Sequence, residues 1–187
     1  MPSLIYLAGF MGSGKSTIGP ILANVLGYEF TDLDERIEAD LGMPIRAYFL
    51  AEGEGAFREA ERRVLEETTQ WTAHVVSLGG GAMAQEANAR MILEAGTVVY
   101  LRASVSELQR RLRRSRHRPM LLDDQGRRLP PDELMQRIRM LLDAREPSYM
   151  QAHLLVDIDN RHVGQTVDDV VRLLRRSERH DSRNERR

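Results

Sequence analysis

The sequence predicts an α/β fold in which a doubly wound, five-stranded parallel sheet is flanked by helices. Short apolar runs alternate along the chain with longer amphipathic segments, as strand–helix–strand units require. Several of these runs are almost continuously apolar, which is typical of parallel strands buried on both faces. A length of 187 residues and a hydrophobic content of 42% fit one domain with a sizeable core.

The elements follow from these runs in chain order. The expected strands are residues 3–8, 28–33, 74–78, 97–101 and 154–158, and the expected helices are residues 15–26, 54–70, 84–94, 105–114, 131–144 and 166–176. Sheets of this kind bind ligands beyond the carboxyl ends of their strands. Candidate functional residues should therefore follow the strands directly.

The domain is expected to span residues 1–176. Within it, residues 116–130 mix Arg, Pro, Asp and Gly between two helices, so a mobile lid is expected at about residues 112–130. Residues 177–187 contain no apolar side chain, and we expect them to form a disordered polar tail.

Composition excludes several classes of protein. The formal net charge is −1, from 27 basic and 28 acidic residues, so no overall field attracts nucleic acid or an anionic membrane. Cysteine is absent, which excludes disulfides and thiol chemistry. No apolar run approaches the ~20 residues of a membrane span, and the apolar start of the chain is too short for a signal peptide. We expect a soluble, cytoplasmic monomer that binds small molecules.

A phosphate-binding loop follows the first strand. Residues 9–16, GFMGSGKS, match G-x-x-x-x-G-K-[ST] between a strand and a helix, where backbone N–H groups cradle phosphates. Lys15, the chain's single lysine, should bridge the β- and γ-phosphates of ATP, and Ser16 should ligate Mg²⁺. The expected ATP ligands of the loop are Gly12, Ser13, Gly14, Lys15, Ser16 and Thr17. The alternative is a glycine-rich turn that binds no nucleotide.

Two absences narrow the nucleotide chemistry. A guanine-reading N-K-x-D motif needs a lysine, and the only one already lies in the loop, so a GTPase is not expected. The third strand ends in Val75-Val76-Ser77-Leu78, without the aspartate that holds magnesium in many nucleotide hydrolases. The metal must be supported elsewhere.

An aspartate pair closes the second strand. Alternation along a strand would place Asp32 and Asp34 on the same face, at the ligand-binding edge. In phosphoryl transfer one carboxylate completes the surroundings of the metal and another accepts a hydrogen bond from the attacking hydroxyl. We expect Asp32 to serve the metal and Asp34 the hydroxyl. The alternative for Asp34 is a helix cap for residues 35–41.

Glycines and arginines complete the candidate site. Gly79, Gly80 and Gly81 follow the third strand directly, so a ligand can approach the backbone there; a plain loop is the alternative. Arg58 lies near the start of a helix, Arg118 in the candidate lid, and Arg145 where a proline stops a helix. Spacing alone does not single out these arginines.

From Ile5 to about Leu174 the chain resembles the shikimate kinase family. The matching features occur in the family's order: GFMGSGKST, TDLDERIE, EGEGAFREAE, SLGGGA, RPMLL, AREPSY and DNR. The resemblance implies a P-loop kinase fold that transfers the γ-phosphoryl group of MgATP to the 3-hydroxyl of shikimate. Lys15, Asp34 and Arg118 would be catalytic.

The resemblance also implies the ligands of both substrates. Asp34, Arg58, Gly80, Gly81 and Arg145 would bind shikimate, with the two arginines on its carboxylate, a group that guanidinium recognises in bidentate fashion. Phe49 and Phe57 would wall its ring. Arg111 and Arg161 would flank adenine, and Arg118 would move with the lid to meet the transferring phosphate.

Pro20 is the most awkward departure from the family pattern, and three alternative functions remain. Pro20 falls inside the helix after the phosphate-binding loop and removes a hydrogen bond to the carbonyl of Ser16. The alternatives are another small-molecule kinase, such as a gluconate or nucleoside monophosphate kinase, a nucleic-acid-binding ATPase suggested by six arginines between Arg110 and Arg118, and a catalytically silent regulator. The three glycines with Arg58 and Arg145 argue against the first, and balanced charge without stacking aromatics argues against the second.

Overall fold

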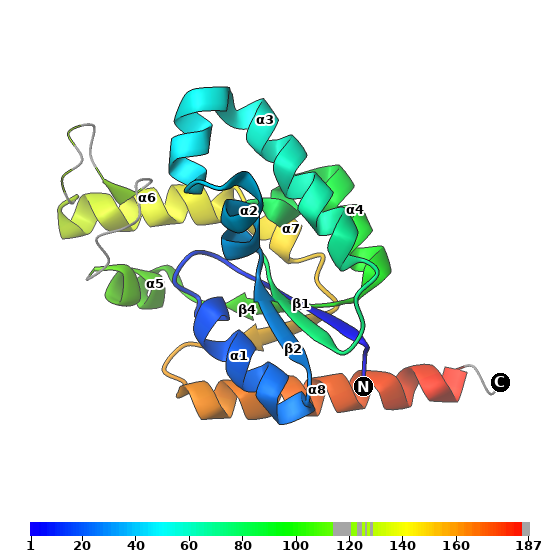
Figure 1. Cartoon of the computed structure of the whole chain (residues 1–187). Coiled ribbons are helices and arrows are strands. Elements are labelled where there is room, and N and C mark those ends of the chain that lie inside the picture. The colour runs from blue at the N-terminus through cyan, green and yellow to red at the C-terminus, as the bar shows by residue number, and fades with distance from the viewer. Residues whose placement is uncertain (114–120, 123–124, 126, 128, 185–187) are drawn as a thin grey trace.

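The computed structural model describes residues 1–113, 121–122, 125, 127 and 129–184. Its strands are β1 (Leu4–Ala8), β2 (Glu29–Asp32), β3 (His74–Ser77), β4 (Thr97–Arg102) and β5 (Leu154–Asp157). Together they form one five-stranded parallel sheet in the order β2-β3-β1-β4-β5 (Figure 1). The sheet confirms the five strands expected from the apolar runs.

Helices cover both faces of this sheet. The helices of the described residues are α1 (Lys15–Leu26), α2 (Leu33–Leu41), α3 (Ile45–Thr68), the 3₁₀ turn η1 (Ala82–Ala84), α4 (Glu86–Ala95), α5 (Val105–Leu112), α6 (Pro131–Asp143), α7 (Glu146–Tyr149) and α8 (Val163–Asn184). In Figure 1, α1 and α8 lie against one face of the sheet, and α3 and α4 lie on the other. The doubly wound architecture is confirmed.

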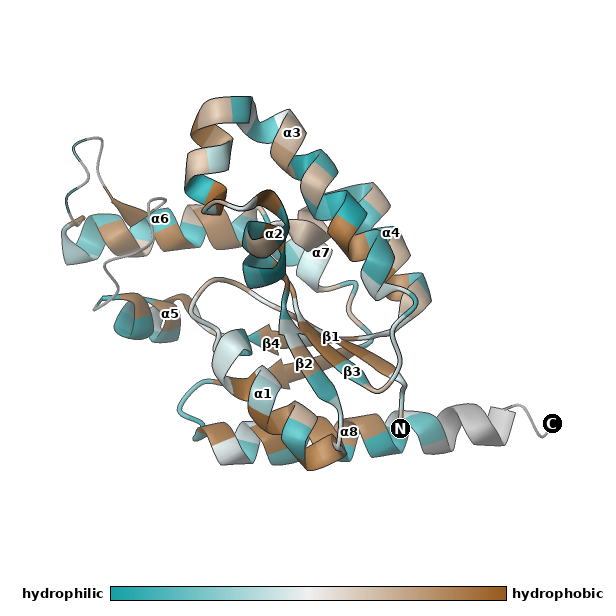
Figure 2. Ribbon diagram, viewed as in Figure 1, coloured by the Kyte–Doolittle hydropathy of each residue, from teal (hydrophilic) through white to brown (hydrophobic). Residues whose placement is uncertain are grey.

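The core is centred on β1. Every residue of β1 is buried, and so are the four central residues of β4. Figure 2 shows these strands as the apolar centre of the molecule, with the polar faces of the helices turned outward. Because all five strands are parallel, the carboxyl ends of β1, β2 and β3 meet at one edge, and the segments that follow them build the site described below.

Helix α1 passes through Pro20 without interruption. Pro20 is exposed, and the helix continues to Leu26, where Gly27 ends it in a left-handed conformation with φ of 70°. The N–H of Gly27 donates to the carbonyls of Ala23 and Asn24, as in a typical glycine cap. The proline therefore costs one hydrogen bond without breaking the helix.

Helix α3 starts earlier than the sequence predicts. The expected helix begins at residue 54, whereas α3 begins at Ile45 and changes direction at Gly53, whose φ of 83° and ψ of 175° are not helical. Glycine tolerates this conformation because it has no Cβ. The expected helix thus corresponds to the part of α3 beyond the kink, and the part before it was missed.

Helix α8 extends beyond the expected end of the domain. Residues 177–184, expected to be a disordered tail, continue this helix to Asn184. The segment has no Gly or Pro, the two residues that most strongly disfavour a helix. The amino group of Met1 also forms an ion pair with Glu178. None of the helices described is both long and apolar enough to cross a bilayer.

Candidate active site

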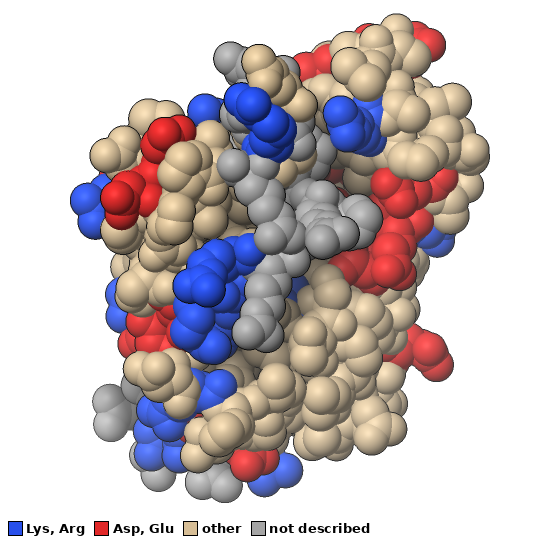
Figure 3. Space-filling view, turned by 90° about the vertical axis from the view of Figure 1, so that its left-hand side faces the viewer, with Lys and Arg blue, Asp and Glu red and all other residues tan. Residues whose placement is uncertain are grey.

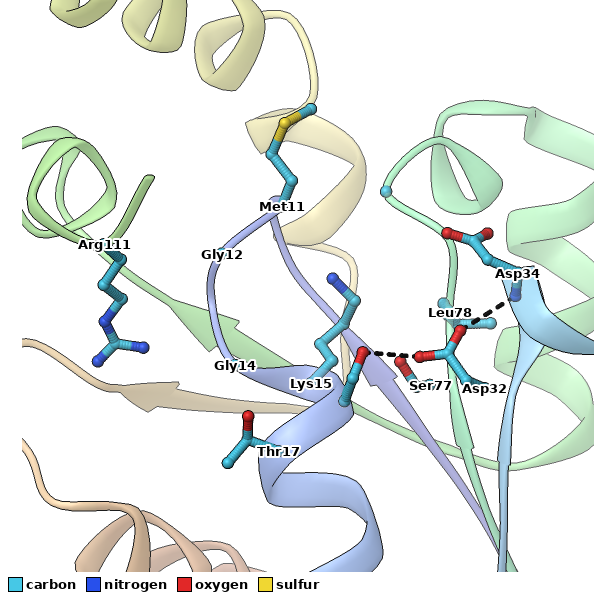
Figure 4. Close-up of a pocket in the computed structure, with 12 residues that line it drawn as sticks. Met11, Gly12, Gly14, Lys15, Thr17, Asp32, Asp34, Ser77, Leu78 and Arg111 are labelled. Carbon is cyan, nitrogen blue, oxygen red and sulfur yellow. Dashed lines mark hydrogen bonds between the residues drawn. The ribbon is translucent and has the colours of Figure 1, made fainter. Parts of the chain in front are cut away.

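A cavity of about 320 Å³ opens at the carboxyl ends of β1, β2 and β3. It is lined by Met11, Gly12, Gly14, Lys15, Ser16, Thr17, Asp32, Asp34, Ser77, Leu78, Gly80 and Arg111 (Figure 4). These residues come from the phosphate-binding loop, the aspartate pair, the end of β3 and helix α5. The fold therefore gathers into one cavity most of the motifs that are separated in the sequence.

The phosphate-binding loop curls between β1 and α1. Gly12 and Gly14 have φ of 80° and 98°, in the region that side chains disfavour, and Gly14 is the N-cap of α1. The Lys15 ammonium donates to the carbonyls of Gly9 at 2.8 Å and Phe10 at 3.4 Å. The ammonium is thus held inside the curve of the loop, at the cavity.

Of the six ATP ligands expected in the loop, Ser13 is the one that does not line the cavity. Its side chain is completely buried, and its Oγ has no hydrogen-bond partner among the described residues. A Cβ at Gly9 would lie 2.8 Å from this oxygen. The Ser13 side chain is therefore not placed to contact a ligand in the cavity, and its backbone N–H donates to the carbonyl of Phe10 at 3.1 Å.

Asp32 connects the loop to helix α2. Its Oδ2 accepts a hydrogen bond from the Ser16 hydroxyl at 2.7 Å, and its Oδ1 accepts one from the N–H of Asp34 at 3.1 Å (Figure 4). Asp32 is thus the N-cap of α2. The alternative in which Asp34 caps this helix is therefore wrong.

Asp34 reaches the cavity by a different route from the expected one. It lies in the first turn of α2 and not on β2, which ends at Asp32, so strand alternation does not relate the two side chains. Both nevertheless line the cavity, where Figure 4 shows Arg111 on the far side of the loop from them. A carboxylate in the first turn of a helix is also stabilised by the helix dipole.

The donor set beside the loop suits Mg²⁺. Magnesium prefers oxygen ligands and is usually bound by one or two protein groups together with phosphates and water. The Ser16 hydroxyl and the Asp32 carboxylate supply such oxygens, already in contact with each other. In the described part of the chain, no group of three or more acidic or His side chains forms a self-sufficient metal site.

Arg58 faces the glycine turn from helix α3. Its guanidinium donates to Glu61 at 2.9 Å and to Glu54 at 3.1 Å. A Cβ at Gly81 would lie 3.1 Å from the nearer guanidinium nitrogen. The glycine therefore lets the arginine lie directly against the backbone.

Glu61 was not singled out from the sequence. It is 2% exposed, and burial raises the pKa of its carboxyl, an effect that Arg58 opposes and Asp34 adds to. The same glutamate raises the pKa of the Arg58 guanidinium against the effect of burial. The three-residue spacing of Arg58 and Glu61 is the signal available in the sequence, but exposed helix pairs share it.

Arg145 approaches the neighbouring glycine of the same turn. A Cβ at Gly80 would lie 3.3 Å from one of its guanidinium nitrogens and 3.9 Å from the Tyr149 hydroxyl. The guanidinium also lies 5.7 Å from the centre of the Phe10 ring. Two arginines from distant parts of the chain thus approach consecutive glycines.

Phe49 and Phe57 form a pair beyond the cavity. Their ring centres are 4.7 Å apart, and the Arg58 guanidinium lies 5.3 Å from the centre of the Phe57 ring. Neither ring lines the 320 Å³ cavity, and Phe57 is buried. The pair is adjacent to Arg58, where a ring wall was expected.

Arg111 joins α5 to the loop. Its guanidinium donates to the carbonyls of Ser13 at 3.2 Å and Ile158 at 3.3 Å and to Glu107 at 2.6 Å. The Arg161 N–H donates to the same Ile158 carbonyl, and its half-exposed side chain lies 3.8 Å from Asp169. The two arginines expected at adenine are thus neighbours.

A local positive region surrounds this part of the molecule. Figure 3 shows basic side chains gathered on the face that carries α5 and α6, although the chain has a formal net charge of −1. Such a region attracts phosphates without an overall basic charge. Arg118 and most of the expected lid lie outside the described residues.

Comparisons with known proteins agree on one family. The family model described as shikimate kinase matches residues 11–175. A shikimate kinase from Chlorobium luteolum is 48% identical over 174 residues, which are 93% of this chain and 86% of that protein.

Solved structures extend the likeness to the fold. A shikimate kinase from Bacteroides thetaiotaomicron is 33% identical, with a TM-score of 0.85 over 94% of this chain and 99% of that one. One from Acinetobacter baumannii, solved in complex with shikimate, is 35% identical, with a TM-score of 0.83 over 94% of each chain.

Proposed function

The chain belongs to the shikimate kinase family, and we propose that it transfers the γ-phosphoryl group of MgATP to the 3-hydroxyl of shikimate. The products are shikimate 3-phosphate and ADP. The single observation that carries this choice of acceptor is the pair of guanidinium groups, Arg58 and Arg145, on consecutive glycines beside Asp34. This arrangement suits a small ligand with one carboxylate and nearby hydroxyls.

The phosphate donor is bound by the loop. Backbone N–H groups of the curled loop and the N-terminus of α1 point toward the phosphates. Lys15 is placed to exchange its bonds with the loop carbonyls for the β- and γ-phosphates, where its charge offsets the negative charge that develops during transfer. Arg111 and Arg161 are assigned to the adenine, and Arg118 to the transferring phosphate.

We assign the Mg²⁺ site to the space between the phosphate-binding loop and the aspartate pair. Ser16 would bind Mg²⁺ directly and Asp32 would accept hydrogen bonds from its water shell, since the two side chains already share a hydrogen bond. When bound, the ion neutralises part of the charge on the β- and γ-phosphates. The contact between Ser16 and Asp32 is the observation that supports this assignment.

A second set of groups, around the glycine turn, orients the acceptor. Asp34 accepts the hydrogen bond of the 3-hydroxyl and takes its proton as the new P–O bond forms. Arg58 and Arg145 bind the carboxylate, with Gly80 and Gly81 beneath and Phe49 and Phe57 beside the ring. Catalysis is then chiefly orientation and charge stabilisation. All of these groups come from one chain, so the proposed active unit is a monomer.

The test combines a panel of substrates with alanine variants of the two arginines. ADP release is measured with shikimate, gluconate and nucleoside monophosphates, and only shikimate should support turnover. Arg58→Ala and Arg145→Ala should each weaken shikimate binding by about 1.5–3 kcal/mol, the scale of a hydrogen bond to a charged group, with ADP affinity nearly unchanged. The double variant should lose less than the sum, because both residues share one partner.

A modified acceptor tests the contribution of the shikimate carboxylate alone. An analogue in which a neutral amide replaces this carboxylate should be a poor substrate for the unmodified enzyme, and its turnover should fall little further in either alanine variant. Equal turnover of the amide, or unchanged shikimate binding in both alanine variants, would contradict the carboxylate clamp. Turnover of gluconate alone would assign the chain to a different acceptor.

A further inference from the structure

Tyr149 contacts both sides of the proposed acceptor site through one oxygen. It is the last residue of α7 and is 1% exposed. Its hydroxyl donates to the carbonyl of Gly80 at 2.6 Å, and the neighbouring Arg145 guanidinium interacts with this hydroxyl and opposes the rise in its pKa. A single phenol therefore joins the arginine to the glycine turn, across 69 positions of sequence.

Fixing this carbonyl also fixes the surface offered to a ligand. The peptide between Gly80 and Gly81 is planar and trans, so its N–H points away from the carbonyl that Tyr149 holds. Without side chains these glycines have little preference of their own among backbone conformations. Backbone N–H groups of Ala82 and Ala84 hold the carbonyls of Gly79 and Gly81, and the hydrogen bond from Tyr149 holds the Gly80 carbonyl between them.

The hydroxyl keeps its proton under working conditions. Burial raises the pKa of Tyr149 to about 12, and the nearby Arg145 opposes this increase only in part. The group thus remains a donor to Gly80 at neutral pH.

Neighbouring groups hold α7 and its tyrosine in place. The Tyr149 ring packs on that of Tyr100, with 5.1 Å between ring centres. The Tyr100 hydroxyl donates to Glu146 at 2.5 Å, next to Arg145 in the chain. A helix as short as α7 has little stability of its own, so these contacts from β4 help to hold it in place.

We propose that Tyr149 is a positioning residue that sets shikimate affinity by fixing the Gly80–Gly81 peptide relative to Arg145. This inference rests on the proposed function of the same site. It differs from the assignment of ligands, because Tyr149 acts on the acceptor through Gly80 and Arg145. Affinity for ATP should be independent of it, since the tyrosine does not line the cavity at the phosphate-binding loop.

The experiment compares two buried tyrosines. Tyr149→Phe deletes the hydroxyl that joins Arg145 to Gly80. The matched control, Tyr6→Phe, deletes an equally buried hydroxyl that is bonded to Thr68 at 2.8 Å and lies outside the cavity lining. Steady-state kinetics with each substrate varied, calorimetric binding of shikimate and thermal unfolding are measured for both variants and the unmodified enzyme.

The expected results separate positioning from general stability. Tyr149→Phe should raise the KM and Kd for shikimate about tenfold, with kcat within about threefold and the KM for ATP unchanged. Amide hydrogen exchange at Gly81 should be faster in this variant. Tyr6→Phe should leave every kinetic constant unchanged while lowering the melting temperature about as much as Tyr149→Phe does.

Each contrary result has a definite meaning. Unchanged shikimate affinity in Tyr149→Phe, or equal increases in both KM values, would overturn the inference. So would an unfolded Tyr149→Phe beside a folded Tyr6→Phe, because Tyr149 would then serve the whole fold. Absence of shikimate turnover in the unmodified enzyme would instead overturn the proposed function.

Discussion

Glu107 offers a test of how α5 is attached to the nucleotide side of the site. This glutamate is 5% exposed and accepts hydrogen bonds from Arg110 and from Arg111. Arg110, the larger influence, and Arg111 lower the pKa of its carboxyl to about 2, from an ordinary value of 4.5. Glu107→Gln keeps the size of the side chain and removes its charge.

The pKa difference gives the size of the effect. At about 1.4 kcal/mol for each pH unit, the full difference corresponds to about 3 kcal/mol of stability. The side chain of Arg110 is 68% exposed, and solvent screens such a partner, so we expect about 1–2 kcal/mol. Because the folded pKa is below the unfolded one, this stability is complete above about pH 4.5 and is lost as the pH falls toward 2.

Urea unfolding at a series of pH values measures this contribution. At neutral pH Glu107→Gln should be less stable by about 1–2 kcal/mol, and the difference should shrink below about pH 4.5. Its KM for ATP should rise while the KM for shikimate stays constant, because Arg111 also contacts the loop carbonyl of Ser13.

Glu94→Gln is the matched control. Its pair with Arg90 is 2.9 Å long but exposed on both sides, so it should lose less than about 0.5 kcal/mol. A stability difference for Glu107→Gln that is the same at pH 7 and pH 3, or as small as that of the control, would refute the reasoning.

Four further outcomes follow from the site and the termini. Lys15→Arg should abolish nearly all turnover despite the conserved charge, because guanidinium does not match the compact ammonium inside the loop; near-normal activity would contradict the loop's role. Asp34→Asn should lose turnover with ATP affinity, measured by calorimetry, within a few-fold; a large loss of ATP affinity would favour a metal role. Gly79→Ala would place a Cβ 2.5 Å from Asp34 Oδ1, so kcat should fall sharply while the melting temperature changes little; retained kcat would show that Asp34 need not be held there. Truncation after Arg176 removes the partner of the Met1 amino group, Glu178, and should cost less than about 1 kcal/mol with no change in kcat; a larger loss would show that the end of α8 supports the domain.

Features that depend on neighbouring residues in the chain were predictable. All five strands were found from apolar runs, and α1 begins and ends where expected, at Lys15 and Leu26. The loop motif also placed Lys15 and Ser16 at the cavity. The strands, α1 and the loop each depend on a few consecutive residues, so their structure can be inferred from local sequence patterns.

Features that depend on distant contacts were not predictable. Asp34 was expected on a strand and lies in a helix, because Asp32 caps α2 and ends β2 early. Tyr149 was not singled out, since its partner Gly80 is remote in sequence and nothing local distinguishes it from an ordinary core tyrosine. Glu61 was missed because its spacing from Arg58 also fits an exposed helix pair, and only burial shows the difference.

The two oxygens of Asp32 have a consequence for how this enzyme could be altered. One binds Ser16 on the donor side and the other binds the backbone of Asp34 on the acceptor side, so a displacement of either half is passed to the other through one rigid carboxylate. Redesign of acceptor specificity should therefore leave α2 untouched and work from α3, which carries Arg58, and from α7, which follows Arg145 and carries Tyr149. The same carboxylate would make Asp32 a poor choice for testing metal binding alone, because a substitution there also removes the cap of α2, the helix that carries the proposed base Asp34.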